Sequence, residues 1–199
     1  MSSSSREPTG LFGGAFDPPH RGHVELVRQA KAKLGLERVL VLVAADPGHK
    51  RVETPAGVRL ELARAAFPDD EVVLDEHPRT VETLRAHPEW GETVFLIGAD
   101  QFQDFPTWHE PGEILRRTRL GVATRPGYPP ERLEAVLATL PHPERVTFFE
   151  IEPTPVSSRD LRSRLENGAD VVPEVPSAVA AIIAREGLYR ADPGYTRVV

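Results

Sequence analysis

The chain has 199 residues, a formal net charge of −6, and 40% hydrophobic against 27% charged residues, which is the balance of a soluble globular protein. The negative charge argues against long nucleic acid as a partner, and the absence of cysteine excludes disulfides, cysteine nucleophiles and thiolate metal sites. No apolar run reaches the roughly 20 residues of a membrane helix, and the opening MSSSSREP lacks the apolar core of a secretory signal, so we expect a cytoplasmic protein that contacts no membrane.

Short apolar runs alternate with segments of helical period along most of the chain. We expect strands at 9–13, 38–44, 71–76, 93–99, 119–124 and 145–151. We expect helices at 21–35, 55–67, 81–87, 110–118 and 130–140, followed by two more at 157–168 and 175–189. This order is typical of an α/β doubly wound fold with a mostly parallel sheet and, here, C-terminal helices. We therefore predict a single domain over 9–190, between a flexible leader at 1–8 and a tail at 191–199.

The stretch GLFGGAFDPPHRGH follows the first expected strand and leads into the first helix. Gly13 and Gly14 permit a tight turn and a close backbone approach, and the N–H groups at the start of the helix favour an anion. His20 and His23 then project toward the same spot, and Gly22 keeps the wall between them low. In an open parallel sheet such a loop lies where ligands bind, so the two imidazoles predict a polyphosphate clamp.

Other readings of the two histidines are a solvent-facing position or a structural one, and two other chemistries can be compared with the sequence. Zinc would need further ligands, but there is neither an HExxH motif nor a cysteine. The loop is neither a GxGxxG nor a GxxxxGK[ST] motif, which disfavours hydride transfer on a dinucleotide and P-loop hydrolysis. The remaining histidines are scattered without ligand spacing, at His49, His77, His87, His109 and His142.

The same loop resembles the GGxFDPxHxGH signature of the nucleotidylyltransferase superfamily, whose HxGH motif binds and polarises ATP phosphates. Later blocks extend the resemblance: ADPGHK is similar to a PPHK-type loop, RTVETL to YTxxTL, and PTPVSSRDLR to a block that ends in ISSTxIR. FLIGADQFQDFPTWHEPGEIL is similar to IGADxLxxFPxWxxxxxIL, and RPGY matches a further block. HxGH alone indicates the superfamily, whereas the ordered set resembles the bacterial nicotinate-nucleotide adenylyltransferases.

The resemblance implies a Rossmann-like nucleotidylyltransferase fold and the reaction of ATP with nicotinate mononucleotide to give nicotinate adenine dinucleotide and pyrophosphate. It implies Mg²⁺ held mainly through the ATP phosphates and water, with no metal site made by the chain. The implied catalytic residues are His20 and His23. The implied ATP-binding residues are Gly13, Gly14, Phe16, His20, His23, Gly98, Asp100, Ser157, Ser158 and Arg162. The implied residues for the mononucleotide are His49, Lys50, Thr83, Trp108 and Arg125.

For several of these groups the residues alone leave alternatives open: a plain turn for Gly13, Gly14 and Phe16, a solvated loop for His49 and Lys50, and a structural cap for Asp100. Ser157, Ser158 and Arg162 at a helix start would form a second anion site, but they are equally compatible with an ordinary cap and a solvated arginine. Arg159 stands where the family has threonine or serine, which leaves its role open. Trp108 offers a flat face to a pyridine ring, although tryptophan is more often a core residue.

Several rival functions also stay open. Another HxGH enzyme would use nicotinamide mononucleotide or pantetheine phosphate as acceptor, and a cytidylyltransferase would use CTP. A non-catalytic nucleotide-binding module would bind ATP without releasing pyrophosphate. The oligomeric state is open as well, because the apolar run AVAAII at 178–183 fits an interface in a homo-oligomer as well as a core.

Overall fold

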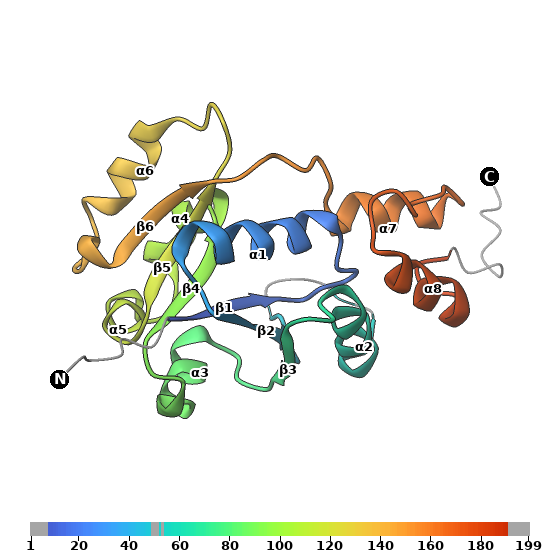
Figure 1. The fold of residues 1–199 in the computed structure, drawn as a ribbon, viewed down its shortest axis with the longest axis horizontal. Helices are drawn as coiled ribbons and strands as arrows, with labels where there is room; N and C mark the ends of the chain where they lie inside the picture. The colour runs from blue at the N-terminus through green and yellow to red at the C-terminus, as the bar shows by residue number, and fades with distance from the viewer. Residues whose placement is uncertain (1–7, 49–51, 53, 191–199) are drawn as a thin grey trace, which may run out of the picture.

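The computed structural model describes residues 8–48, 52 and 54–190, which form one six-stranded sheet with helices on both faces (Figure 1). All strand pairs are parallel, in the order β3-β2-β1-β4-β5-β6. This is the doubly wound order, so the predicted fold class is confirmed. The strands are β1 Thr9–Gly14, β2 Arg38–Ala44, β3 Glu71–Asp75, β4 Thr93–Gly98, β5 Arg119–Thr124 and β6 Val146–Glu150.

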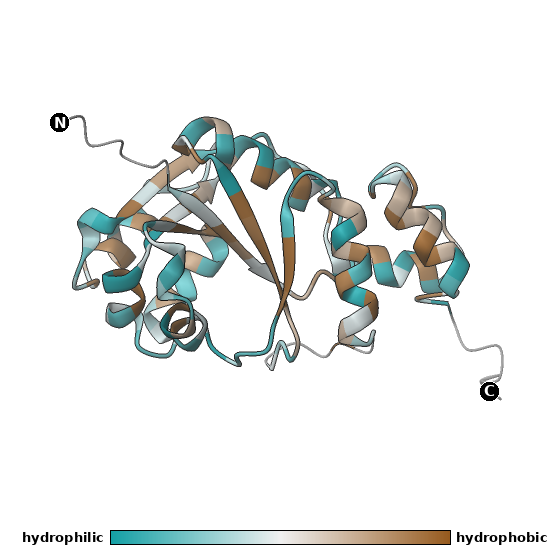
Figure 2. Cartoon of the chain, turned by 60° about the horizontal axis from the view of Figure 1, so that its bottom comes forward, coloured by the Kyte–Doolittle hydropathy of each residue, from teal (hydrophilic) through white to brown (hydrophobic). Residues whose placement is uncertain are grey.

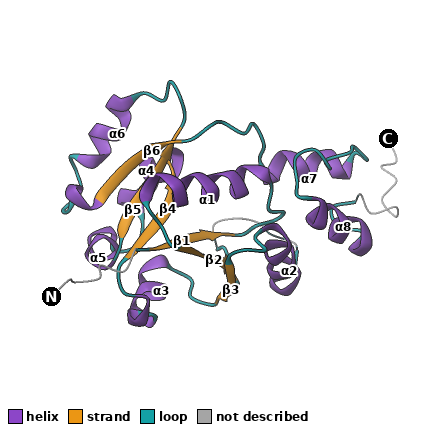
Figure 3. Cartoon of the chain, viewed as in Figure 1, coloured by secondary structure: helices purple, strands orange, loops and turns teal. Residues whose placement is uncertain are grey.

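The helices flank this sheet, as Figure 3 shows. They are α1 Arg21–Leu34, α2 Ala56–Ala66, α3 Thr80–Ala86, α4 Ala99–Asp104, α5 Pro111–Arg117, α6 Pro130–Leu137, α7 Ser158–Glu166 and α8 Ser177–Glu186. Three single 3₁₀ turns are η1 Pro88–Trp90, η2 Phe105–Thr107 and η3 Pro143–Arg145. The sequence prediction contained all of these helices except α4, which is only six residues long and therefore too short to display a helical period.

Two apolar clusters lie on opposite faces of the sheet. Along β2, Val39, Val41 and Val43 belong to the cluster under α1, α2, α7 and α8. Leu40 and Leu42 point to the other face and belong to the cluster under α3, α4, α5 and α6. A strand that buries both faces must be apolar at every position, which explains the continuous run in β2. Figure 2 shows this apolar character along the central strands.

Helix α8 belongs to the core. Val179, Ile182 and Ile183 are buried in the same cluster as Leu62 of α2, so the AVAAII run packs within the chain. Among the described residues the only large hydrophobic side chain that is exposed is Val172. The expectation of a homo-oligomer stays a prediction. No helix within the described ranges is long and apolar enough to cross a membrane.

The order of the strands reverses between β1 and β4, and there the two strands part. β1 pairs with β2 from Thr9 through Gly14, but it pairs with β4 only from Thr9 to Leu11. The carboxyl ends of β1 and β4 therefore part from each other, at the position where doubly wound sheets bind ligands. The loop after β1 and the start of α4 follow these two strand ends.

Candidate active site

The loop between β1 and α1 is anchored by Phe16. This residue adopts a left-handed backbone, with φ of 52°, and its side chain is buried. Its ring meets the rings of Phe12 and His23 at centroid distances of 5.5 and 5.3 Å. Phe16 thus fixes the loop from the core side and packs against one of the two histidines.

His20 and His23 are stacked at the start of α1. Their ring centroids are 3.7 Å apart with an angle of 22° between the planes. The backbone N–H of His20 donates to Nδ1 of His23 at 3.2 Å, and the backbone N–H of His23 donates to the His20 carbonyl at 2.9 Å. The helix start therefore holds both rings side by side, as the HxGH spacing predicts.

The His20 imidazole is uncharged at neutral pH. The residue is 7% exposed, and burial lowers its pKa from 6.5 to about 4. Its Nδ1 atom is buried and has no hydrogen-bond partner among the described residues. A buried polar atom without a hydrogen-bond partner is rare in folded proteins. Because this atom lies next to a helix N-terminus, it suits an anionic ligand that would supply the missing partner.

Gly22 is required by the position of His20. A Cβ atom at Gly22 would lie 3.1 Å from two atoms of the His20 ring and 3.3 Å from Cγ1 of Val156. These distances are tighter than ordinary contacts, so any side chain would displace the imidazole or the segment before α7. This agrees with the prediction that Gly22 keeps the wall between the histidines low.

The start of α7 docks onto the histidine loop. Oγ of Ser158 donates to the Pro18 carbonyl at 2.9 Å, and Nη1 of Arg162 donates to the Asp17 carbonyl at 2.6 Å. Ser157 caps α7 by accepting the backbone N–H of Asp160 at 3.2 Å, and it is exposed. Two helix starts that are far apart in the sequence are therefore brought to one loop. This juxtaposition is what an extended polyphosphate site needs.

Arg59 was missed by the sequence analysis, although it holds the same loop. It is 2% exposed and donates to the carbonyls of Thr54, Ala15, Ala44 and Ala45 at 2.7 to 3.0 Å. The signal for it exists in the helical period, because Arg59 precedes the buried residues Leu62, Ala63 and Ala66 of α2 by three, four and seven positions. Arg59 ties the end of β2 to the loop after β1.

Gly98 lies at the carboxyl end of β4, and Asp100 follows in the first turn of α4. Gly98 is the N-cap of α4, and its N–H donates to Oε1 of Gln101 at 3.2 Å. Asp100 is exposed in the first turn. Gly13 faces this strand, since a Cβ atom there would lie 3.2 Å from Cζ of Phe95.

The predicted mononucleotide residues are more dispersed. The Trp108 ring is half-buried against Phe95 and Phe105, at centroid distances of 6.2 and 5.4 Å, so Phe95 connects Trp108 to the end of β1. The Thr83 hydroxyl is buried and donates to Oδ2 of Asp75 at 2.7 Å. Arg125 is exposed after β5. His49 and Lys50 lie outside the described residues.

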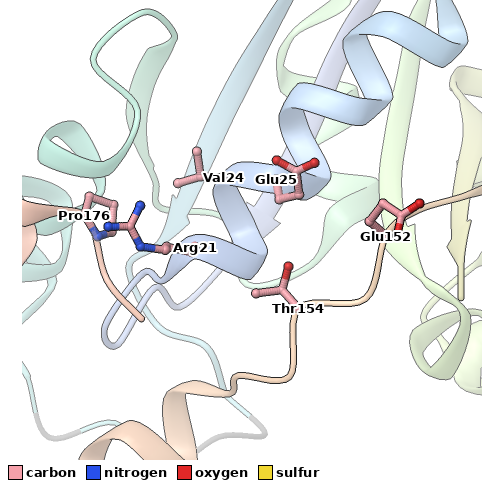
Figure 4. A pocket seen from close by; sticks show the side chains of 6 residues that line it. All are labelled: Arg21, Val24, Glu25, Glu152, Thr154 and Pro176. Carbon is pink, nitrogen blue, oxygen red and sulfur yellow. The ribbon is translucent and has the colours of Figure 1, made fainter. Parts of the chain in front are cut away.

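No metal centre is formed by the described part of the chain, where no group of three or more His, Asp or Glu residues could hold an ion. The side chains that meet at the histidine loop are His20, His23, Ser158 and Arg162, with Asp17 as the one carboxylate. One carboxylate beside several N–H and O–H groups suits phosphate oxygens rather than a cation held by the protein. A separate open hollow of about 370 Å³ lies beside α1 and contains none of the predicted site residues (Figure 4). It is lined by Arg21, Val24, Glu25, Glu152, Thr154 and Pro176.

Known proteins resemble this chain in sequence and in fold. A family model described as cytidylyltransferase-like matches residues 11–164. A Bordetella petrii protein and a Thermus thermophilus protein, each described as "Probable nicotinate-nucleotide adenylyltransferase", are both 38% identical over 91% of this chain and 98% of their own. Plasmodium falciparum nicotinic acid mononucleotide adenylyltransferase, solved with APC and with NaAD, covers 92% of this chain and 98% of its own. Its TM-scores are 0.70 and 0.71 at 16% and 17% identity, a likeness of fold alone.

Proposed function

The chain belongs to the cytidylyltransferase-like family and, within it, to the nicotinate-nucleotide adenylyltransferases, and on that premise we propose that it joins ATP and nicotinate mononucleotide. The products are nicotinate adenine dinucleotide and pyrophosphate, a step of NAD biosynthesis. The observation that carries the proposal is the meeting of the stacked His20 and His23 with the start of α7 at one loop.

The reaction needs no nucleophile from the protein. A phosphate oxygen of the mononucleotide forms a bond to the α-phosphorus of ATP, while the bond from that phosphorus to the bridging oxygen breaks. The electron pair of that bond leaves with pyrophosphate. Catalysis then consists of alignment and of stabilising the negative charge that builds up on the leaving group.

We assign that charge stabilisation to the histidine pair. A neutral His20 donates one N–H to a phosphate oxygen without carrying a buried charge, and a bound polyphosphate favours protonation of either ring. The backbone N–H of Gly22, in the first turn of α1, adds a further donor, whereas those of His20, Arg21 and His23 already donate to groups of the chain. Arg162 lies on the other side of the same loop, where its N–H groups other than the one bonded to the Asp17 carbonyl extend the donor set along the triphosphate. Ser158 gives its one hydroxyl proton to the Pro18 carbonyl, so its side chain holds the loop beside the triphosphate.

Divalent metal enters this proposal with the substrate. The described residues at the site offer donors and no set of carboxylates, which does not fit a protein-held Mg²⁺. Mg²⁺ therefore binds to the ATP phosphates and water, and the two arrive together.

The acceptor end is proposed around Trp108 and Thr83. Trp108 stacks on the pyridine ring with the face that Phe95 and Phe105 do not cover, and backbone N–H groups near Thr83 bind the pyridine carboxylate. The Thr83 hydroxyl proton already points to Asp75, so this side chain acts as an acceptor or a spacer rather than as the donor to the carboxylate. His49 and Lys50 are proposed to hold a phosphate of either substrate, and Arg125 to reach the adenine or the phosphate side.

The test compares acceptors in the same assay. We expect pyrophosphate release with ATP and nicotinate mononucleotide to exceed the release with nicotinamide mononucleotide or pantetheine phosphate. Faster reaction with pantetheine phosphate would overturn the substrate assignment. ATP binding without any pyrophosphate release would identify a non-catalytic module instead.

A variant test addresses the histidine pair. We expect His23→Ala to lower kcat by about 100-fold with a much smaller change in KM, because the lost interaction acts mainly on the charge of the leaving group. His142→Ala serves as control, since His142 precedes η3 and its ring pairs with Glu144, away from the histidine loop. A kcat of His23→Ala equal to that of the wild type would remove the pair from the mechanism.

A further inference from the structure

We propose that Tyr189 is a positioning residue for ATP, because its hydroxyl holds the Asp17 carboxylate and thereby keeps the Arg162 guanidinium available to the triphosphate. The inference rests on the proposed function. It adds a residue that follows the last helix and that no motif in the sequence analysis contains.

The end of α8 directs Tyr189 back toward the histidine loop. Gly187 ends the helix with a left-handed φ of 62°, and the N–H of Leu188 donates to the Ile183 carbonyl at 3.0 Å. Tyr189 itself has a φ of 60°, which is unfavourable for a residue with a side chain. Its hydroxyl donates to Oδ1 of Asp17 at 2.7 Å, a contact that offsets this backbone strain.

Asp17 is a buried carboxylate with several neighbours competing for it. It is 3% exposed, and its Oδ2 lies 3.9 Å from Nη1 of Arg162, too far for a hydrogen bond. The buried guanidinium of Arg59 also lies within electrostatic range. Burial raises the pKa of Tyr189, so the phenol stays a proton donor at neutral pH. The Tyr189 bond thus fixes Asp17 without adding charge.

The consequence for Arg162 follows from its donors. Arg162 uses Nη1 for the Asp17 carbonyl and makes no second hydrogen bond to the described residues. Without the Tyr189 hydroxyl, the Asp17 carboxylate would turn to the nearest donor and form a close, charge-assisted pair with Arg162. That pair would compete with the phosphates for the guanidinium. Tyr189 therefore acts on the ATP side of the site and leaves the acceptor side unaffected.

The experiment measures binding of α,β-methylene ATP to the full chain by calorimetry, for the wild type, Tyr189→Phe and Tyr128→Phe. We expect Tyr189→Phe to raise the Kd for the analogue by about fivefold, which is the effect of one ordinary hydrogen bond. The KM for ATP should rise by a similar factor. The KM for nicotinate mononucleotide stays unchanged. Tyr128→Phe is the matched control, because its hydroxyl accepts only from Gln103 among the described residues, and it should bind like the wild type.

Two results would overturn the inference. One is an unchanged Kd in Tyr189→Phe, and the other is an equal loss of affinity for ATP and nicotinate mononucleotide together with a lower fraction of active protein. Asp17→Asn provides a second measurement. If Tyr189 acts through Asp17, the double variant Asp17→Asn with Tyr189→Phe binds the analogue no more weakly than Asp17→Asn alone. Additive losses of affinity would contradict an action of Tyr189 through Asp17. A wild type that binds the analogue but forms no dinucleotide would refute the proposed function while leaving this comparison readable.

Discussion

His20 lies at the N-cap of α1, where burial lowers its pKa to about 4, whereas the same side chain in an unfolded chain titrates near 6.5. Between these two values the unfolded chain binds more protons than the folded one. The free energy of unfolding therefore falls as the pH drops through this window. Protonation of His20 lowers the free energy of unfolding by about 3 kcal/mol in total once the pH is below 4. Above about pH 7 this loss of stability is absent.

We expect urea unfolding to report this loss directly. The wild type should lose more stability between about pH 7 and pH 5 than His20→Asn, which has no imidazole to protonate. The other titrating groups contribute equally to both proteins and cancel in the comparison. Parallel pH profiles for the two proteins would contradict the buried, neutral state of His20.

Gly22 and Gly57 form a natural pair for a second experiment, since each is the second residue of its helix. Alanine is preferred over glycine in helices by up to about 1 kcal/mol, so neither substitution should unfold the protein. A Cβ atom at Gly22 would press on the His20 ring, whereas one at Gly57 meets nothing within 4 Å. We expect Gly22→Ala to lower kcat/KM by about tenfold to 100-fold and Gly57→Ala to leave it unchanged. Equal activity of the two variants would show that the imidazole tolerates displacement.

Helix α2 stabilises the loop through one side chain. Arg59 supplies hydrogen bonds to four carbonyls of three separate segments, and no lysine could reach them all, since a lysine has one nitrogen instead of a planar fork. We expect Arg59→Lys to reduce the free energy of unfolding by about 2 to 4 kcal/mol, because buried carbonyls lose their donors. Arg64→Lys, on an exposed position of the same helix, should change it little. The measurement is equilibrium urea unfolding, and a similar midpoint for both variants would refute the role given to Arg59.

The elements were predicted well where they are long or strongly patterned. All six strands lie within two residues of their predicted ends, because a buried parallel strand is apolar throughout. Helix α4 escaped prediction because six residues give less than two turns of pattern. Arg59 escaped because a charged residue on a buried helix face is rare, and its carbonyl partners belong to loops whose paths a sequence does not reveal.

The sequence predicts the site as a set of motifs but not as an arrangement. The sequence placed His20, His23, Ser158 and Arg162 among the functional residues, and the structure brings all four to one loop. The link from Tyr189 to Asp17 spans 172 positions and belongs to no local pattern. Such contacts depend on the complete topology, in which β1 lies at the centre of the sheet and α8 packs on α2.

The prediction of a single domain over 9–190 implies that this part of the chain unfolds as one unit. Helices α7 and α8 share an apolar cluster with β1, β2 and α2, so we expect them to unfold together with the sheet. Far-UV and near-UV circular dichroism should follow one coincident thermal transition in the protein without ligand. Two separated transitions would show that the C-terminal helices form a unit of their own.

The bond from Ser158 to Pro18 joins positions 140 residues apart. A ribosome adds residues from the N-terminus onward, so the histidine loop leaves the exit tunnel long before its partner helix has been translated. During that interval the loop lacks the hydrogen bonds that Ser158 and Arg162 donate to it. The contact between the two helix starts therefore forms late in translation, only after residue 162 has left the tunnel.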